Sequence, residues 1–514
     1  MKLSYESMVL MSKIGRSIKK KFMKTLDNPM DVQRDLLLKI LKENKDTEYG
    51  KKYDFASIRS IEEYQSKVPV CGYDEFAPYV EKMLNGEKNI LSVEKITHFN
   101  KTSGTIGVPK KIPCSEKNIK LFGKFYAMYY NGVALSEMGT KWIRGKCLNM
   151  SEGMLTDLKN GMTYGSASAL SAKRLNKGIM KKINDGIYTS PVEAKLPVKG
   201  TNTRYLHARF ALANKDITWA SVSFVSFFLE MLRYIEKNWE MLVDDIEKGV
   251  LNESVNIPEP SRSNLSKRIK PNPKRAQELR EIFSNGFGDY VFTKVWPKFE
   301  VIMTVGGSTF MGYTNKIKNH YFGDQLKFLY IGLSSSEGLF SVPFEMENLN
   351  SVFVPESTFM EFIPVDEENV RYLTLDQLEN GKKYEIVLTN ISGFYRYKLR
   401  DIVLITGKLR NTPTMQFLHR ADAMVSVTGE KTSEIALSNT VESAAKELGF
   451  DLVDYSVYPD QDSAPSRYKF LVEACSIPKG VNKEMIRQTI EKYLSINNPS
   501  MGDKIKNGIC GPVE

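Results

Sequence analysis

The sequence predicts an α/β protein with a large multi-layer domain at residues 1–419 and a small α/β domain at residues 420–514. Three observations lead to this prediction. The 514 residues exceed the roughly 250–300 residues beyond which a single core stops growing. Short apolar segments bounded by turn residues, which are typical of strands, dominate from residue 300 onward. After about residue 420, strand-like and helix-like segments alternate, which indicates a separate small unit.

The first half of the large domain is predicted to be mainly helical. Residues 30–44 carry Leu and Ile on one helical face, and residues 220–242 form a long apolar stretch of helical character. A short strand at residues 97–100 leads into a glycine-containing loop. Residues 254–273 hold four prolines among Ser and Asn residues, which predicts an exposed connection.

Four strands are predicted in the second half of the large domain, at residues 301–305, 328–333, 359–365 and 384–389. In the small domain, a helix at residues 433–448 ends at Gly449, a residue type that commonly terminates helices. Strands at residues 452–458 and 468–474 and a helix at residues 483–494 complete the predicted small domain.

The composition narrows the class of function. Hydrophobic residues make up 42% and charged residues 26% of the chain, which excludes a disordered protein. The balance of 72 basic and 61 acidic residues gives 72 − 61 = +11, which is compatible with an anionic ligand. No motif of interleaved aromatic and basic residues is present, so we expect no nucleic-acid partner.

The cysteines and the N-terminal segment bear on the compartment. Five cysteines and four histidines lack paired spacings, which argues against a disulfide framework or zinc site and favours a reducing cytoplasm. No apolar run reaches the roughly 20 residues that span a bilayer. Residues 1–24, with three lysines at 19–21 after a short apolar stretch, are interpreted as an amphipathic surface helix; a membrane-surface helix is the alternative.

The sharpest functional signal is Thr-Ser-Gly-Thr-Ile-Gly-Val-Pro-Lys-Lys at residues 102–111, directly after a predicted strand. Small hydroxyl side chains and glycines let backbone N–H groups approach a phosphate, and Lys110 and Lys111 add positive charge. The segment is not a Walker A loop, because the Lys-Ser/Thr ending is missing. A plain turn between strands is the alternative interpretation.

Two later segments could serve the same ligand. Residues 304–308, Thr-Val-Gly-Gly-Ser, end a predicted strand, where open α/β sheets bind ligands, although a plain turn is equally compatible. Residues 334–338, Ser-Ser-Ser-Glu-Gly, place hydroxyls beside one carboxylate. This combination suits a phosphate-bound Mg²⁺, with a capping turn as the alternative.

Two segments near the domain boundary complete the set. Asp401 lies at a strand and could accept both hydroxyls of a ribose, unless a salt bridge with Arg396 or Arg400 occupies its carboxylate. Residues 429–434, Gly-Glu-Lys-Thr-Ser-Glu, place a lysine in a loop before a helix, where a simple helix cap is the alternative.

Together these segments resemble the adenylate-forming superfamily of acyl and aryl ligases. Within it, the chain is most similar to the auxin-responsive acyl-acid amido synthetases, which include the jasmonate-amido synthetase. The resemblance runs from about residue 30 to the C-terminus and implies the large-plus-small-domain fold of that superfamily. Its motifs occur in the family's order, at residues 102–110, 335–337, 359–364, 395–401 and 431–434.

The resemblance implies a role for each motif. The implied nucleotide-binding residues are Thr102, Ser103, Gly104, Thr105, Gly306, Gly307, Ser335, Ser336, Glu337, Asp401 and Lys431. Of these, Thr105, Glu337 and Lys431 would be catalytic, and Thr105 and Glu337 would hold Mg²⁺. Asp401 would bind the ribose hydroxyls, and Lys431 would reach the nucleotide from a mobile small domain. The implied acyl-binding residues, on a helix that is equally compatible with a core position, are Trp219, Val222, Val225 and Phe228.

The sequence departs from the family pattern at three places. Leu333 stands where the family has an aromatic residue, so adenine stacking would fall to another side chain, with Tyr330 and Phe340 as candidates. Leu399-Arg400 replaces the usual Val-Gly. The small domain is expected to be incomplete, because relatives continue into a further lysine-bearing segment.

The implied reaction is ATP-dependent adenylation of a carboxylic acid to an acyl-AMP, followed by transfer of the acyl group to an amine, expected to be an amino acid. The expected cofactors are ATP and Mg²⁺, and the expected state is a cytoplasmic monomer that acts on small molecules. Two alternatives stay open, namely a thiol acceptor such as coenzyme A and a nucleotide-binding protein without turnover.

Overall fold

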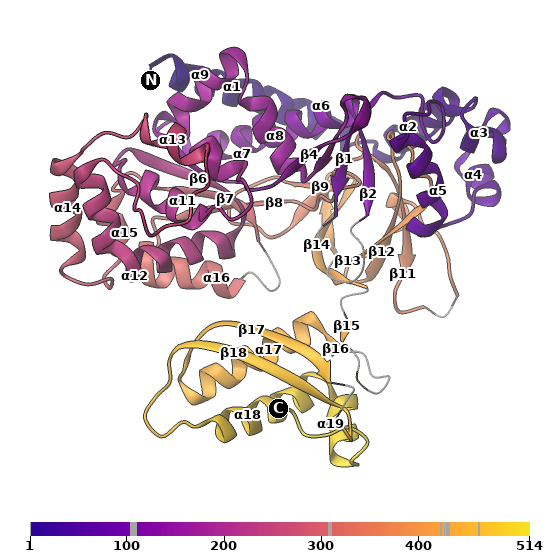
Figure 1. The fold of residues 1–514 in the computed structure, drawn as a ribbon. Coiled ribbons are helices and arrows are strands. Elements are labelled where there is room, and N and C mark those ends of the chain that lie inside the picture. The colour runs from indigo at the N-terminus through magenta and orange to yellow at the C-terminus, as the bar shows by residue number, and fades with distance from the viewer. Residues whose placement is uncertain are drawn as a thin grey trace. The chain divides into compact units, whose positions relative to one another are not determined.

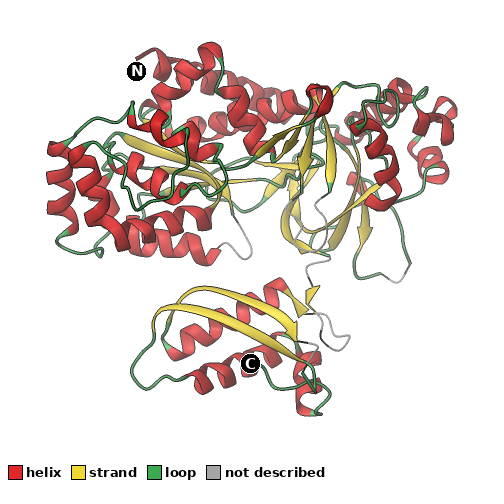
Figure 2. Cartoon of the chain, in the orientation of Figure 1, coloured by secondary structure: helices red, strands yellow, loops and turns green. Residues whose placement is uncertain are grey.

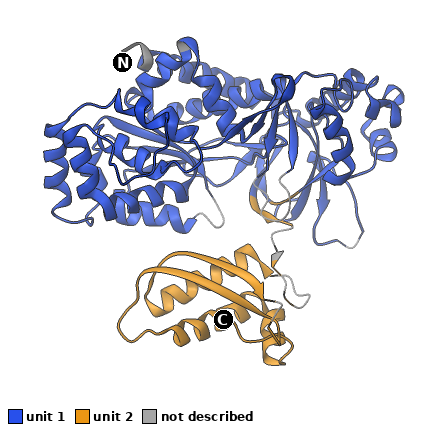
Figure 3. Cartoon of the chain, in the orientation of Figure 1, with its two compact units in different colours: residues 1–399, 404–416 blue, residues 400–403, 417–514 orange. Residues whose placement is uncertain are grey.

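A computed structural model gives the fold of the chain (Figure 1). It describes residues 2–102, 110–306, 311–367, 369–421, 424–425, 427, 432–460 and 463–514. The chain forms two compact units (Figure 3). The larger unit comprises residues 1–399 and 404–416, and the smaller unit comprises residues 400–403 and 417–514.

A four-stranded parallel sheet with the order β3-β6-β7-β8 organises the larger unit. Its strands are β3 (Lys146–Met150), β6 (Ile217–Phe224), β7 (Val301–Val305) and β8 (Lys327–Ile331). Helices flank these strands, as Figure 2 shows. Because both faces are covered, the strands are nearly continuous runs of buried residues, as expected for a parallel sheet.

The side chains of this sheet alternate between two hydrophobic cores. Ala220 and Ile302 face a core that includes residues of α11 (Thr203–Leu212) and α12 (Val225–Lys248). Trp219 and Val301 face a second core, to which α1 (Lys2–Thr25) and α7 (Tyr130–Met138) contribute. Because successive side chains of these strands point to opposite faces, the sheet packs against both cores of the larger unit.

The predicted helix over residues 220–242 is wrong at its start. Residues up to Phe224 belong to β6, and α12 begins at Val225. A fully buried strand followed directly by a buried helix reads as one uninterrupted apolar run, so hydrophobic periodicity does not locate the junction. Likewise, the predicted connection at 254–273 contains the short helix α13 (Ser261–Ser266).

Two further sheets complete the larger unit. The sheet β2-β1-β5-β4 contains β1 (Ile96–Lys101), β2 (Lys111–Ser115), β4 (Leu155–Asp157) and β5 (Thr163–Gly165). The six-stranded sheet β11-β12-β13-β14-β10-β9 comprises β9 (Ser341–Pro343), β10 (Ser351–Phe353), β11 (Phe359–Pro364), β12 (Lys383–Thr389), β13 (Tyr397–Leu409) and β14 (Thr412–Arg420). The boundary between the units runs through β13 and β14.

The remaining helices of the larger unit cover these sheets. They are α2 (Pro29–Asn44), α3 (Glu48–Lys52), α4 (Ile61–Lys67), α5 (Tyr73–Leu84), α6 (Glu116–Lys124), α8 (Ala167–Leu175), α9 (Gly178–Ile187), α10 (Val192–Lys195), α14 (Pro273–Phe283), α15 (Val291–Val295) and α16 (Met311–Lys316). A π-helical segment, Phe125–Tyr129, joins α6 to α7. None of the helices in the described part of the chain is both long and apolar enough to cross a membrane.

In its described residues the smaller unit contains two antiparallel sheets of two strands each, β15-β16 and β17-β18, and three helices. Its strands are β15 (Met424–Val425), β16 (Thr432–Ser433), β17 (Asp451–Asp460) and β18 (Arg467–Ser476). Its helices are α17 (Glu434–Leu448), α18 (Lys483–Asn497) and α19 (Pro499–Lys506). Gly449 takes a φ of +70° and ends α17, as the sequence predicts.

Helices α1 and α7 cross with their backbones in close approach at two glycines. A Cβ atom on Gly132 would lie 2.3 Å from the carbonyl carbon of Gly15, a backbone atom that cannot move aside alone. We therefore predict that Gly132→Ala destabilises the larger unit by about 1–3 kcal/mol, the usual effect of overpacking. Chemical denaturation of the full chain measures this change in the free energy of unfolding.

Gly123, on α6, provides the matched control. A Cβ atom there meets no atom within 4 Å. Gly123→Ala is therefore expected to stabilise the protein by about 0.5–1 kcal/mol, the gain in helix propensity. Equal effects of the two substitutions would contradict the close crossing of α1 and α7.

Candidate active site

The carboxyl edge of the parallel sheet carries two of the predicted motifs. β7 ends at Val305 and continues into Gly306, and β8 ends at Ile331 shortly before the turn at residues 334–338. Because β7 and β8 are parallel neighbours, both motifs emerge at the same edge. This edge is where open α/β sheets place their ligands.

Hydrogen bonds within the turn fix the position of Glu337. Ser335 N donates to Gly338 O at 2.9 Å, and Glu337 N donates to Ser335 Oγ at 3.1 Å. Ser335 Oγ in turn donates to Glu337 Oε2 at 2.7 Å. Glu337 is 5% exposed, and the hydroxyl of Ser335 holds its carboxylate in one orientation within the turn.

Two asparagines connect this turn to distant parts of the chain. Asn100, near the end of β1, donates from Nδ2 to Ser336 O at 2.8 Å, and Ser336 Oγ donates to Lys101 O at 3.3 Å. Asn390 donates from Nδ2 to Glu337 O at 2.9 Å. The structure therefore brings the end of β1, directly before the predicted phosphate loop, next to the Ser-Ser-Glu turn. Sequence reasoning did not identify either asparagine.

The phosphate loop is closed at its base. Thr102 N donates to Lys110 O at 3.4 Å, and Lys110 N donates to Thr102 Oγ1 at 3.1 Å. The Lys110 ammonium lies 5.5 Å from the ring centre of Tyr73 and 5.9 Å from that of Tyr397. Lys111 instead forms a 3.1 Å ion pair with Glu81, so the two lysines differ in their surroundings. The predicted residues Ser103, Gly104 and Thr105 lie outside the described residues.

Gly306 is a position that only glycine can occupy beside Tyr330. An added Cβ atom would lie 2.0 Å from Cδ1 of Tyr330. Tyr330 is 7% exposed and stacks on Phe328, and Phe340 is completely buried. Neither candidate ring is exposed enough in this conformation to stack a base. Gly307 lies outside the described residues.

The contacts of Asp401 and Arg396 exclude one alternative that the sequence left open, a salt bridge between these two residues. Asp401 is 6% exposed, and its Oδ1 lies 3.4 Å from Arg420 Nε. The alternative of a salt bridge between Asp401 and Arg396 is wrong, because Arg396 pairs with Glu361. Arg400 takes a φ of +68°, in the left-handed region that favours glycine. This conformation accounts for the glycine that the family pattern has at that position.

A buried ion pair lies just before β13. Arg396 Nε and Arg396 Nη2 donate to Glu361 at 3.0 and 2.9 Å, and both side chains are at most 2% exposed. Arg396 Nη1 also donates to the backbone carbonyls of Gln65 and Val68, both at 2.7 Å. Burial raises the pKa of the Glu361 carboxyl, while the guanidinium of Arg396 opposes that shift. The pair ties β11 and the end of α4 to the start of β13.

The donor set around Glu337 bears on metal binding. In the part of the chain that the structure describes, no group of three His, Cys, Asp or Glu side chains converges. One oriented carboxylate beside a phosphate loop is nevertheless compatible with Mg²⁺, which commonly takes one or two protein carboxylates together with phosphate oxygens. Lys431 lies outside the described residues.

The residues predicted to bind the acyl group lie in the protein core. Trp219 and Val222 are on β6 rather than on the predicted helix, and Val225 and Phe228 are on α12. All four are at most 4% exposed. A cavity of about 330 Å³ lies near them and is lined by neighbouring residues, including Met150 and Phe227.

Comparison with known proteins gives the class first. The fold resembles that of a solved 2-hydroxyisobutyryl-CoA ligase in complex with an acyl-AMP, with a TM-score of 0.53, 11% identity and coverage of 91% of this chain and 83% of that chain. The predicted α/β fold of adenylate-forming type is therefore confirmed. A solved acyl acid amido synthetase, AtGH3.15 with 2,4-DB, gives a TM-score of 0.83 at 22% identity over 97% of this chain and 88% of that chain.

The family follows from the sequence. Residues 18–327 match the GH3 family N-terminal domain, 351–420 the central domain and 436–514 the C-terminal domain. The chain belongs to the GH3 family. It is 26% identical to the indole-3-acetic acid-amido synthetase GH3.3 of Arabidopsis thaliana, over 94% of this chain and 84% of that protein. It is 28% identical to the jasmonoyl-L-amino acid synthetase GH3.5 of Oryza sativa subsp. japonica, over 85% and 79%. The resemblance and the ligase class predicted from the motifs are confirmed.

The buried pair of Glu361 and Arg396 leads to a stability prediction. Glu361→Ala leaves the guanidinium of Arg396 buried without its carboxylate. We expect the free energy of unfolding to fall by about 3–5 kcal/mol, as is usual when one partner of a buried ion pair is removed. Urea denaturation of the full chain provides the measurement.

Glu367→Ala serves as the control. Glu367 forms an exposed ion pair with Arg371 on the same unit, so its removal is expected to cost at most about 1 kcal/mol. If Glu361→Ala were no more destabilising than Glu367→Ala, the buried pair would not have the structural role described above.

Proposed function

We propose that this protein is an ATP-dependent acyl-acid amido synthetase. In the first step a carboxylate oxygen of the acid attacks the α-phosphorus of ATP, which gives an acyl-AMP and pyrophosphate. In the second step an amine, preferably that of an amino acid, attacks the acyl carbon. The new C–N bond replaces the C–O bond to AMP, which leaves, and the amine loses a proton.

One observation carries this proposal beyond family membership. The hydrogen bonds of Asn100 and Ser336 join the base of the phosphate loop to the turn that holds Glu337, at the carboxyl edge of the parallel sheet. Residues separated by 236 positions in the chain are thereby held next to each other, which supports the proposal. A nucleoside triphosphate suits this place, because the small residues of the adjoining loop would offer backbone donors to its phosphates.

The residues of this chain would act mainly by positioning and by stabilising charge. Thr102, with Ser103, Gly104 and Thr105, would hold the phosphates through N–H and hydroxyl donors. Lys110, between its two tyrosine rings, would supply positive charge at the same place. Holding the acid near the α-phosphorus converts a bimolecular encounter into a reaction within one complex.

Mg²⁺ is part of the proposal. Glu337 together with Thr105 would hold it, and the bound ion would neutralise charge on the phosphate oxygens. Ser335 fits this arrangement, because its hydroxyl orients the carboxylate of Glu337.

The remaining features are proposed from the sequence and the family resemblance. Gly306, Gly307 and Asp401 would contact the nucleoside part of ATP, and Lys431 would reach the nucleotide from a mobile small domain at residues 420–514. We propose a monomer in the cytoplasm. None of the five cysteines, all of which are described, forms a disulfide, which is compatible with a reducing compartment.

Release of pyrophosphate tests the proposed function. Purified protein with ATP and Mg²⁺ is expected to release pyrophosphate only when a suitable carboxylic acid from a panel is present, and mass spectrometry is expected to find an amide when amino acids are added. Formation of a thioester with coenzyme A instead would show that the acceptor is a thiol rather than an amine. Tight ATP binding without pyrophosphate release for any acid would indicate a nucleotide-binding protein without turnover.

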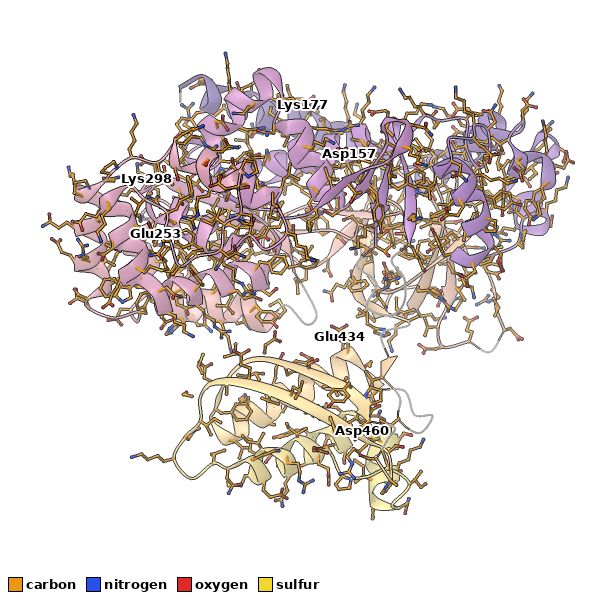
Figure 4. All side chains as sticks on the ribbon, viewed as in Figure 1. Asp157, Lys177, Glu253, Lys298, Glu434 and Asp460 are labelled. Carbon is orange, nitrogen blue, oxygen red and sulfur yellow. The ribbon has the colours of Figure 1, made fainter. Side chains whose placement is uncertain are left out.

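Asp401→Ala tests the nucleotide site directly. Removing the carboxylate that would accept hydrogen bonds from the ribose hydroxyls is expected to weaken ATP binding by about tenfold or more, as judged by calorimetry. Asp157→Ala is the control, because Asp157, labelled in Figure 4, is 80% exposed and forms an ion pair with Lys173. Unchanged ATP affinity in Asp401→Ala would contradict its role.

A further inference from the structure

The solvent-facing side of α1 combines lysines with exposed aliphatic side chains. α1 packs against α7 and α9 at a margin of the larger unit, where Figure 1 labels it. Six exposed residues of α1 lie within an arc of about 120° around its axis, because successive residues of an α-helix are turned by about 100°. This arc is called the outer face of α1, and its residues are Leu10, Lys13, Ile14, Lys20, Lys21 and Lys24.

The inner side of α1 is fixed in the core of the larger unit. Phe22 is 1% exposed, and its ring meets those of Phe125 and Tyr129 edge-on, at centroid distances of 5.7 and 5.3 Å. Gly15 packs directly against the backbone at Met128, which leaves no space for a side chain there. Because the helix is held in this way, it cannot rotate to expose its inner side. Only the outer face is available to a partner.

The positive charge of the outer face is not neutralised within the protein. In the part of the chain that the structure describes, none of its four lysines forms an ion pair. Glu6, the single acidic residue of α1, pairs with Arg144 at 3.4 Å. Lys20 and Lys24 are four positions apart, a spacing at which like charges on a helix repel each other. An external surface of negative charge would relieve this repulsion.

Leu10 and Ile14 indicate which kind of anionic surface fits. They are 59% and 43% exposed and lie one helical turn apart. Aliphatic side chains gain free energy when they leave water for hydrocarbon, which a lipid surface offers and a nucleic-acid backbone does not. Lysine suits the same place, because its apolar stem can lie at the lipid boundary while its ammonium group contacts head groups. The outer face therefore fits an anionic lipid surface better than a nucleic acid.

We propose that the outer face of α1 docks this protein reversibly on membranes that contain anionic lipids. Its four lysines contact the negatively charged head groups, and Leu10 and Ile14 enter the boundary between head groups and acyl chains. The contact stays shallow, because the inner side of the helix remains in the protein core. The anionic lipids of the cytoplasmic leaflet provide such a surface in the proposed compartment. The proposal concerns where the protein lies and does not depend on its catalytic activity.

Flotation of the full chain with lipid vesicles tests the proposal. Vesicles with about 30% phosphatidylserine in phosphatidylcholine are expected to bind the protein, whereas vesicles of pure phosphatidylcholine are not. Raising the sodium chloride concentration from about 0.1 M to about 0.5 M is expected to release the protein, because salt screens exposed charges. Equal binding to both kinds of vesicle, no binding to either, or binding that salt does not weaken overturns the proposal.

A charge-neutralised variant tests the lysines. Replacing all four lysines of the outer face by glutamine is expected to raise the Kd for anionic vesicles by about a hundredfold or more, since each lysine near the surface contributes about fivefold. The control variant replaces four other exposed lysines that form no ion pair with described residues, so it loses the same charge from other elements. These control substitutions are Lys237→Gln, Lys267→Gln, Lys270→Gln and Lys274→Gln.

The control variant is expected to change the Kd by less than about twofold, because charges far from the contact are screened. If the two variants weakened vesicle binding equally, net charge alone would govern it and the proposal would be overturned.

The aliphatic residues distinguish a lipid surface from other polyanions. Leu10→Gln combined with Ile14→Gln keeps every charge and is expected to weaken vesicle binding by about tenfold, because the apolar contact is lost. Polyuridylate serves as the nucleic-acid probe. Binding to it as tight as to anionic vesicles, with vesicle binding unaffected by the two substitutions, would overturn the assignment to lipid. If the four-lysine variant fails to fold, this pair of substitutions and the salt dependence decide the outcome.

Discussion

The start of β13 depends on the buried ion pair between Arg396 and Glu361. Arg396 satisfies its guanidinium with Glu361 and with backbone carbonyls near the end of α4, and so anchors three segments of chain at one point. A buried guanidinium without such partners would be strongly unfavourable. Because this ion pair holds the residue directly before β13, it fixes the start of the strand that carries Asp401.

The active-site edge is assembled by polar contacts between elements far apart in sequence, whereas the sheet beneath it is held by apolar packing. Ala220 and Ile302 belong to one core, and Trp219 and Val301 belong to the other, so the sheet cannot shift without disturbing both. A rigid sheet of this kind allows short loops at its carboxyl edge to present catalytic groups in a defined geometry.

The sequence predicts those parts that depend on local signals. The strand at residues 301–305 and the helix that Gly449 ends agree with the structure, because apolar runs and cap residues act over a few positions. The Asn100–Ser336 contact escaped prediction because nothing in local spacing relates residues 236 positions apart. The location of Trp219 on a strand was missed because a buried parallel strand lacks alternation. In the candidate site, the motif residues stay predictions from composition, and the two asparagines that hydrogen-bond to the Ser-Ser-Glu turn have no local sequence signal.

The π-helical segment at residues 125–129 has a consequence for how this protein can vary. A π turn holds one more residue than an α turn, and here Tyr126 bonds to Ser334 in the turn that carries Glu337. If the same residues formed a regular α-helix instead, every later residue of α7 would be rotated by about 100°. Gly132 would then turn away from Gly15, and a bulkier side chain would face α1. The π turn is therefore constrained from both of its ends, by the contact with the candidate site on one side and by the helix crossing on the other.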